Sequence, residues 1–164
     1  LTTVAQKGCF VHCSSIKLPE NNTLTKAYNA FCKVTGCVVP GLEIDLKKGI
    51  PSGGGLGGGS SDAAALVRML ERLCDVRLSD SELDDIAAET GSDVFFFMHC
   101  DEKGRGCALV SGRGENVEQI HGRDDLFLVL IFPEVSSSTK EAYALVDEAF
   151  ARGKFLVSPE FDEL

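Results

Sequence analysis

The run Pro51-Ser-Gly-Gly-Gly-Leu-Gly-Gly-Gly-Ser-Ser61 is the most distinctive part of this sequence. Six of the seven residues from Gly53 to Gly59 are glycine. Each ordered glycine costs about 0.5–1 kcal/mol relative to alanine in a regular element, and a simple turn needs only one or two. A flexible linker is the other plain interpretation, but regular patterns on both sides of the run argue against it.

The segments that flank this run predict a strand before it and a helix after it. Leu42-Glu-Ile-Asp-Leu46 alternates apolar and acidic residues, which is typical of a strand with one wet face. A helical stripe predicts a helix from Ser60 to Cys74 that starts at Ser60-Ser61-Asp62. The stripe consists of Ala63, Leu66, Val67, Leu70 and Leu73. Backbone N–H groups and the positive end of a helix dipole therefore meet at the glycine loop, and we interpret it as a cradle for a polyphosphate.

Two familiar phosphate-loop templates do not fit. Gly53, Gly55 and Gly58 satisfy G-x-G-x-x-G, but in so glycine-rich a run the match is nearly automatic. A dinucleotide-binding loop also requires an acidic residue at the end of a second parallel strand, whereas Glu82 lies in a helix-start pattern. A Walker A loop ends in Gly-Lys-Ser/Thr, whereas Gly59 is followed by serine.

The loop holds no lysine, so the charge of a polyphosphate must be neutralised from elsewhere. Lys47 and Lys48, just upstream of the loop, and a divalent ion are the candidates. Solvated charge at a strand end is the alternative interpretation for both lysines.

Other patterns along the chain indicate further helices and strands. Residues 3–16 are typical of a strand pair, and 126–132 of a strand buried on both faces. Strict alternation of strand and helix is missing, which favours an α+β fold. We expect a helix that is capped by Asn22 and ended by Gly36, with an apolar face of Leu24, Ala27, Tyr28 and Phe31. Two capping boxes predict further helices: Ser79-Asp-Ser-Glu82 starts a helix that ends at Gly91, with Leu83, Ile86 and Ala87 inward, and Ser138-Thr-Lys-Glu141 starts a helix that reaches about Phe150. A strand is expected at Cys107–Val110, followed by a turn at Gly112–Glu115.

The composition restricts the partners of the protein. The 164 residues have a formal net charge of −9, which disfavours a nucleic acid, while local positive groups still allow a small anionic substrate. No signal peptide or membrane-length apolar run is found, so we expect a cytoplasmic protein without a membrane partner. The seven cysteines form no C-x-x-C pair and are interpreted as reduced thiols. Cys9-x3-Cys13, with His12 between, is only a weak metal candidate, and His12, His99 and His121 receive no chemical role.

The loop and the residues after it resemble a known family. Pro51-x3-Gly55-Leu-Gly-Gly-Gly-Ser-Ser61-Asp-Ala-Ala64 resembles the second signature motif of the GHMP kinases (galacto-, homoserine, mevalonate and phosphomevalonate kinases). Its glycine pattern is most similar to the branch of the family that phosphorylates a hydroxyl of a cytidyl-diphosphate substrate in non-mevalonate isoprenoid biosynthesis. The resemblance implies ATP and Mg²⁺ as cofactors. It implies that the nucleotide is bound by Pro51, Ser52, Gly53, Gly54, Gly55, Leu56, Gly57, Gly58, Gly59, Ser60, Ser61, Asn22 and Lys48.

Further segments extend the resemblance from about residue 20 to 145. Gly91-Ser-Asp-Val-Phe-Phe-Phe97 resembles a family segment whose aspartate is catalytic, which implies that Asp93 is the catalytic base. The sequence pattern alone favours a helix-cap aspartate there, and a cap position also suits the ionised carboxylate that a base requires. The resemblance places Thr139 and Tyr143 at the cytidine, with Tyr143 stacked on the base; a core position is the alternative for Tyr143. Phe95 replaces a family proline, so we expect some loss of local rigidity.

The family implies a two-domain fold whose nucleotide-binding half is of the ribosomal protein S5 domain 2 type. We expect residues 1–134 to form that half and residues 135–164 to begin the substrate-binding domain. The family's first motif, with its lysine, and its third, glycine-rich motif are absent, so we expect a chain that is incomplete at both ends. Another GHMP small-molecule kinase and a nucleotide-binding fragment without catalysis are the alternative functions.

Overall fold

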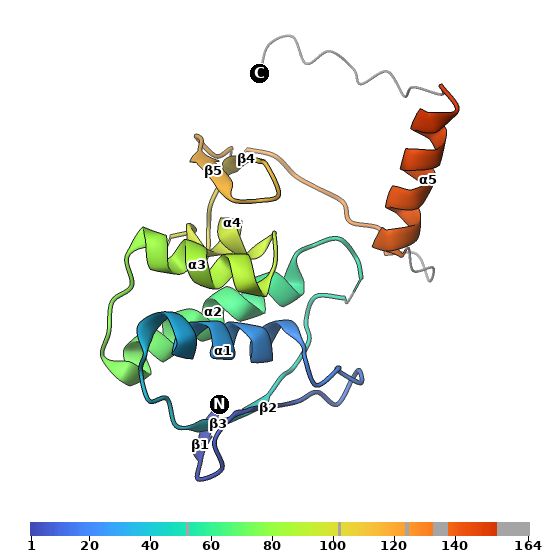
Figure 1. Cartoon of the computed structure of the whole chain (residues 1–164). Coiled ribbons are helices and arrows are strands. Elements are labelled where there is room, and N and C mark those ends of the chain that lie inside the picture. Colours follow the sequence, from blue (N-terminus) through green and yellow to red (C-terminus); the bar gives the residue numbers. More distant parts are fainter. Residues whose placement is uncertain (52, 102, 124, 133–137, 154–164) are drawn as a thin grey trace. The chain divides into compact units, whose positions relative to one another are not determined.

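The computed structural model describes residues 1–51, 53–101, 103–123, 125–132 and 138–153 (Figure 1). Two compact units, Leu1–Val129 and Leu130–Leu164, divide the chain. The elements are β1 (Thr2–Val4), β2 (Cys9–His12), α1 (Thr23–Thr35), β3 (Gly41–Asp45), α2 (Gly58–Cys74), α3 (Asp80–Thr90), α4 (Val94–Met98), β4 (Ala108–Ser111), β5 (Asn116–Gln119) and, in the second unit, α5 (Thr139–Ala151). The expected α+β class is confirmed. No helix in these ranges is long and apolar enough to cross a membrane.

The first sheet has the order β1-β3-β2. β3 pairs antiparallel with β1, Thr2 opposite Glu43, and parallel with β2, Cys9 opposite Leu42. The expectation of a strand pair within residues 3–16 is therefore wrong in its pairing, because β3 lies between the two strands. Sequence periodicity indicates that a segment is extended but does not identify its neighbour in the sheet.

The first helix, α1, follows its sequence signals closely. The Asn22 side chain accepts hydrogen bonds from the N–H groups of Leu24 and Thr25, at 3.0 and 3.1 Å. Gly36 ends the helix with a left-handed backbone at φ 66°. The expected inward face is confirmed, since Leu24, Ala27, Tyr28 and Phe31 are buried.

The core of the first unit joins the elements on either side of the glycine loop to the helix that follows Asp93. α1 packs against β2, α2 and α3, and α4 packs against α2 and α3 (Figure 1). The largest fully buried side chains are Phe31, Leu42, Leu70, Ile86, Val67 and Val94. These come from α1, β3, α2, α3 and α4, so one core positions both the strand before the loop and the helix after it.

The capping box of α3 is confirmed. Ser79 accepts from the N–H of Glu82, and the Glu82 carboxylate accepts from the N–H of Ser79 at 2.8 Å. That backbone hydrogen bond lowers the pKa of Glu82. Gly91 closes the helix with its N–H on the Ala87 carbonyl, but its backbone is extended rather than left-handed. Of the expected inward side chains, Ile86 and Ala87 are buried and Leu83 is half-buried.

The strand predictions contain two errors, one wrong expectation and one omission. Residues 126–132 form no strand, and the expected core positions there, such as Phe127 and Ile131, are exposed. The apolar run has no partner strand among the described residues, and a strand buried on both faces needs neighbours that pair with it. The second error is an omission. The Gly112–Glu115 turn joins β4 to β5, a hairpin strand whose short polar sequence gives no strand signal.

Candidate functional site

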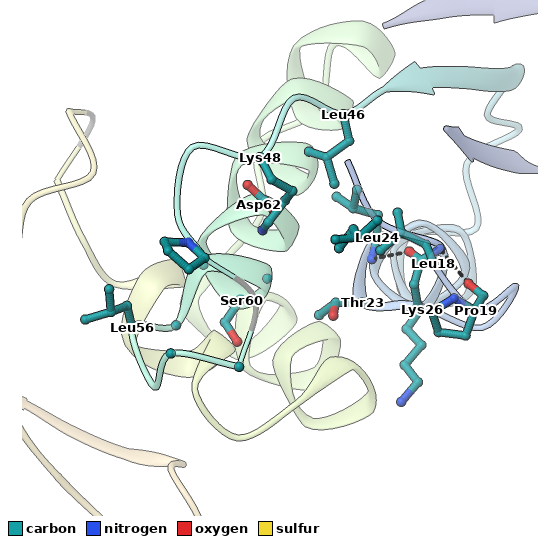
Figure 2. A pocket seen from close by; sticks show the side chains of 18 of the residues that line it. Leu18, Pro19, Thr23, Leu24, Lys26, Leu46, Lys48, Leu56, Ser60 and Asp62 are labelled. Carbon is teal, nitrogen blue, oxygen red and sulfur yellow. Dashed lines mark hydrogen bonds and ion pairs between the residues drawn. The ribbon is translucent and has the colours of Figure 1, made fainter. Parts of the chain in front are cut away.

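The glycine loop lines a cavity of about 430 Å³ between the starts of α1 and α2 (Figure 2). Pro51, Gly53–Gly59 and Ser60 form one wall of this cavity, which we call the loop cavity. Asn22, Thr23 and Lys26 form the facing wall at the start of α1. Most of the expected nucleotide-binding residues are therefore brought to one place. Ser52 lies outside the described residues.

Helix α2 begins earlier than the sequence predicts. Its N-cap is Gly57, which has a left-handed backbone at φ 64° and no side chain to cap the helix. The N–H groups of Ser60 and Ser61 both donate to the Gly57 carbonyl, at 3.0 and 2.9 Å. The expected helix start at Ser60-Ser61-Asp62 is therefore wrong, because these residues already form the first turn. Gly58 and Gly59 are the first two residues of that turn, and their N–H groups have no intrahelical acceptor.

The expected stripe of α2 is confirmed except at its end. Ala63, Leu66, Val67 and Leu70 are buried, whereas Leu73 is 44% exposed. The helix ends at Cys74, and Leu73 lies in its last turn, beyond the neighbours that cover the rest of the stripe.

The glycines at the start of α2 allow other groups to approach closely. A Cβ on Gly58 would lie 3.1 Å from the Ile50 side chain and 3.5 Å from Lys48 Nζ. A Cβ on Gly59 would lie 3.3 Å from Thr23 Oγ1, at the first residue of α1. Two helix N-termini are thus held against one cavity. Each contributes a partial positive charge, which is the electrostatic requirement for an anion site in an acidic protein.

The backbone of the loop is available to a ligand. Within the described part of the chain, the N–H groups of Gly53–Gly57 donate to no other residue. Gly53, Gly55 and Gly57 all have positive φ, at 78°, 70° and 64°. Alternating left-handed residues turn successive N–H groups toward one side, which is the arrangement of an anion-binding nest.

Lys48 is the cation that the structure places beside the loop. Its Nζ lies 2.8 Å from Asp62 Oδ2, and its side chain is only 12% exposed (Figure 2). Lys48 and Asp62 lie on opposite sides of the loop in the sequence, so their ion pair ties the two ends of the loop together. Lys47 is exposed and does not line the loop cavity. Of the two candidate lysines, only Lys48 is positioned for the loop. Asp62 was missed because its pairing depends on a contact 14 residues away.

Two residues with expected nucleotide contacts also have structural roles. The Asn22 side chain caps α1 and donates to the Pro19 carbonyl at 3.0 Å, so it builds the cavity wall. The Ser61 hydroxyl donates to the Gly58 carbonyl at 2.9 Å, and Ser61 does not line the loop cavity. Ser60, which lines it, is the serine that is better placed for a ligand.

Asp93 immediately precedes α4 and is exposed. It has a helical backbone, with φ −72° and ψ −12°, and its side chain makes no capping hydrogen bond. Among the described residues, its carboxylate has no hydrogen-bond or ion-pair partner. Asp93 therefore occupies the N-cap position, as the sequence predicts, without capping the helix. It is not among the residues that line the loop cavity.

The turn between β4 and β5 lies directly against the segment that carries Asp93. A Cβ on Gly114 would lie 2.3 Å from the carbonyl oxygen of Ser92. Gly114 is buried, although it belongs to a hairpin turn. Phe95, where the family has proline, is also buried and packs into the core under this segment.

The expected substrate residues belong to the second unit. Thr139 is the first residue of α5, and its side chain lies outside the described part of the structure. Tyr143 lies on the same helix and is 69% exposed, so the alternative of a core position does not hold within the described residues. Ser138 caps α5 by accepting from the N–H of Glu141.

The described residues contain no group of three or more His, Cys, Asp or Glu side chains that could hold a metal ion. His12 instead approaches Glu43 at 3.2 Å, and His99 approaches Asp84 at 2.8 Å. All seven cysteines are free. The weak candidate pair at Cys9 and Cys13 therefore gains no support.

Cys9 and Cys13 are expected to differ in reactivity. Burial raises the pKa of Cys9 to about 11, whereas a hydrogen bond with the Ser15 hydroxyl lowers the pKa of Cys13. The thiolate is the nucleophile, so at pH 8 Cys13 should react with iodoacetamide at least about tenfold faster than Cys9. Labelling of Cys9 should keep rising with pH up to about 11, the value at which its thiol ionises. Both residues lie in one tryptic peptide, so fragment ions must locate the label. Equal labelling at pH 8 would contradict the assigned environments.

Comparison with known proteins identifies a family domain that includes the glycine loop and Asp93. Residues 22–101 match the GHMP kinases N terminal domain. The chain is 44% identical over 151 residues to a protein of Thermotoga maritima named 4-diphosphocytidyl-2-C-methyl-D-erythritol kinase, with 92% of this chain and 52% of the relative covered. A protein of the same name from Lawsonia intracellularis is 42% identical over 147 residues, with 87% of this chain and 46% of the relative covered.

A solved structure agrees with these relatives. The crystal structure of a 4-(cytidine 5'-diphospho)-2C-methyl-D-erythritol kinase superposes with a TM-score of 0.62 at 28% identity. The match covers 93% of this chain and 57% of that one. The chain thus spans about half the length of the curated relatives it matches.

Proposed function

Because this chain belongs to the GHMP kinase superfamily, we propose that its glycine loop binds ATP for transfer of a phosphoryl group to a hydroxyl of 4-diphosphocytidyl-2-C-methyl-D-erythritol. The observation that carries the proposal is the convergence of two helix N-termini and Lys48 on a cavity lined by glycine backbone. The named relatives support the choice of substrate. The protein would act in the cytoplasm, in non-mevalonate isoprenoid biosynthesis.

In this proposal the phosphates of ATP lie against the backbone N–H groups of the loop. Lys48 and the start of α2 offset their charge, and Asn22 shapes the wall beside the base. Mg²⁺ would neutralise further phosphate charge when bound. Of the protein oxygens, the Ser60 hydroxyl lines the cavity, is free of the Lys48 ion pair and suits a hard cation. Phosphate oxygens would supply most of its ligands, consistent with the lack of a described acidic cluster.

Asp93 is the proposed catalytic base. The substrate hydroxyl oxygen forms a bond to the γ-phosphorus as the bond from that phosphorus to the β–γ bridging oxygen breaks, and ADP leaves. The hydroxyl proton passes to the Asp93 carboxylate, which has no competing partner among the described residues. A carboxylate is a weak base toward an alcohol, so proton transfer comes late, and positioning and charge neutralisation supply most of the rate. Tyr143 would stack on the cytosine ring, and Thr139 would lie beside it.

The proposal is tested first by nucleotide binding to this chain, measured by titration calorimetry with ATP and Mg²⁺. Absence of binding would refute it. Phosphoryl transfer requires a protein of the relatives' full length, offered the cytidylated methylerythritol beside homoserine and mevalonate. Preference for one of the other alcohols would favour another GHMP kinase, and binding without transfer to any of them would favour a non-catalytic nucleotide-binding protein.

Replacement of Lys48 by methionine is expected to weaken ATP binding about tenfold, or about 1.4 kcal/mol. The change removes the cation beside Gly58 and leaves the Asp62 carboxylate unpaired, where it repels the phosphates. Lys47→Met is the matched control, because that exposed neighbour loses the same charge outside the cavity. The double variant Lys48→Met with Asp62→Asn should recover part of the affinity. Equal dissociation constants for the two single variants would contradict the role of Lys48.

A further inference from the structure

The phenyl ring of Phe97, on α4, lies directly against the glycine loop. A Cβ on Gly57 would lie 2.7 Å from Phe97 Cε2 and 2.9 Å from Cζ. Real Cβ atoms do not approach aromatic carbons so closely, so any other residue at position 57 would displace either the ring or the loop. Gly57 is also the N-cap of α2, the point at which the loop becomes the helix.

The same side of α4 carries Asp93. Asp93 already has a helical backbone, and Phe97 follows it by four residues within the helix. Residues four apart lie on one face of a helix. The ring that contacts Gly57 therefore lies on the face of α4 that presents the Asp93 carboxylate.

The ring is itself held in place by its neighbours. Phe96 packs edge-on against it, with centroids 5.2 Å apart and an interplanar angle of 75°. Arg68, from α2, donates to the carbonyl oxygens of Phe97 and Cys100, at 3.5 and 2.5 Å, and of Asp101, at 2.6 Å. These bonds fix the end of α4 to the helix whose first residues form the loop. The contact between Phe97 and Gly57 adds a second attachment, at the N-cap of α2.

From this geometry we infer that Phe97 is a positioning residue that fixes the position of the phosphate loop relative to Asp93. The inference rests on the proposed function, since the position of the loop matters only if the loop binds a nucleotide. Phe97 is not among the residues that line the loop cavity. It acts through Gly57, by fixing where the first N–H groups of α2 stand.

The loop offers a matched pair of substitutions to test this role. Gly57→Ala and Gly55→Ala both place a side chain on a left-handed backbone, at φ 64° and 70°. They differ in surroundings, because nothing lies within 4 Å of a Cβ on Gly55. Both variants carry the backbone strain, and only Gly57→Ala also carries the clash with the ring. We expect Gly57→Ala to bind ATP at least about tenfold more weakly than Gly55→Ala, because overpacking against the ring displaces the first N–H groups of α2.

A second substitution separates positioning from mere packing. Phe97→Leu removes Cε2 and Cζ, so the double variant Gly57→Ala with Phe97→Leu should return to the ATP affinity of Gly55→Ala. A purely structural contact would lower the unfolding midpoint without this recovery of nucleotide affinity in the folded protein. Gly36→Ala, with a left-handed backbone and open space remote from the loop, is the control for destabilisation, and should leave ATP affinity unchanged.

The outcomes are distinct when affinity and thermal unfolding are measured on the same samples of this chain. Weaker binding in Gly57→Ala with recovery in the double variant supports the inference. Equal affinities for Gly57→Ala and Gly55→Ala, or no recovery, overturn it and leave the proposed function standing. If Gly57→Ala does not fold, Phe97→Leu alone must weaken ATP binding, and an unchanged dissociation constant overturns the inference. No binding by the unsubstituted chain overturns the proposed function itself.

Discussion

Asp93→Asn is expected to lower kcat for phosphoryl transfer by about 10²–10⁴-fold, the usual contribution of a positioned general base. The KM for ATP should stay within about twofold, because Asp93 does not line the loop cavity. Asparagine has nearly the same shape as aspartate and is an equally good N-cap residue, so the start of α4 should be preserved. The substitution therefore removes the basic oxygen without changing the helix.

The measurement uses a protein of the relatives' full length, because this chain spans about half of it. Steady-state kinetics gives kcat and both KM values, and titration with a non-hydrolysable ATP analogue checks nucleotide binding separately. Asp85→Asn is the control, since it removes the same charge from an exposed position on α3. Near-normal turnover by Asp93→Asn with intact nucleotide binding would contradict the assignment. A fall in unfolding stability with normal kcat would return Asp93 to a structural role.

The features that were predicted correctly depend on residues close together in the sequence. Asn22 caps α1 through N–H groups two and three residues on, and the Ser79–Glu82 box is complete within four residues. The glycine loop was recognised in the same way, because left-handed backbones and missing side chains are properties of the glycines themselves. Local hydrogen bonding leaves a signature in a single stretch of sequence.

What escaped prediction depends on contacts between distant segments. β3 separates β1 from β2, although nothing in either outer strand indicates it. The Lys48–Asp62 pair and the ring of Phe97 against Gly57 need the fold before they can be seen. At residues 126–132 the error is the opposite one, since a strand was predicted and none is formed. Apolar composition indicates that a segment can form a strand, but it does not indicate that a partner strand is available.

Gly114→Ala is expected to have the largest effect on stability, at least about 2 kcal/mol, because strain and overpacking add at this position. Gly114 has φ 126°, a conformation that residues with a side chain rarely adopt. Its Cβ would also lie 2.3 Å from the Ser92 carbonyl oxygen and 2.9 Å from the carbonyl carbon. Backbone atoms cannot rotate away as a side chain does. Either the turn or the segment that begins at Gly91 must therefore move.

Gly112→Ala is the matched control within the same turn. It also has a left-handed backbone, at φ 72°, but its Cβ would meet the Glu115 carboxylate, 2.4 Å away. That carboxylate lies at the end of a flexible side chain and can move away by giving up its hydrogen bonds from backbone N–H groups of the turn, that of Arg113 among them. Urea unfolding should place the midpoint of Gly114→Ala well below that of Gly112→Ala, with similar slopes.

The same variant also tests how Asp93 is held in place. Ser92 is its direct neighbour, so a displaced Ser92 backbone moves the proposed base while the loop cavity keeps its lining. At a temperature where the full-length Gly114→Ala protein is still folded, kcat should fall more than ATP affinity. Gly112→Ala should keep both values close to those of the unsubstituted protein. Equal stability and equal kcat for the two variants would mean that the turn does not support Asp93, and that the close approach of Gly114 to Ser92 relaxes at no cost.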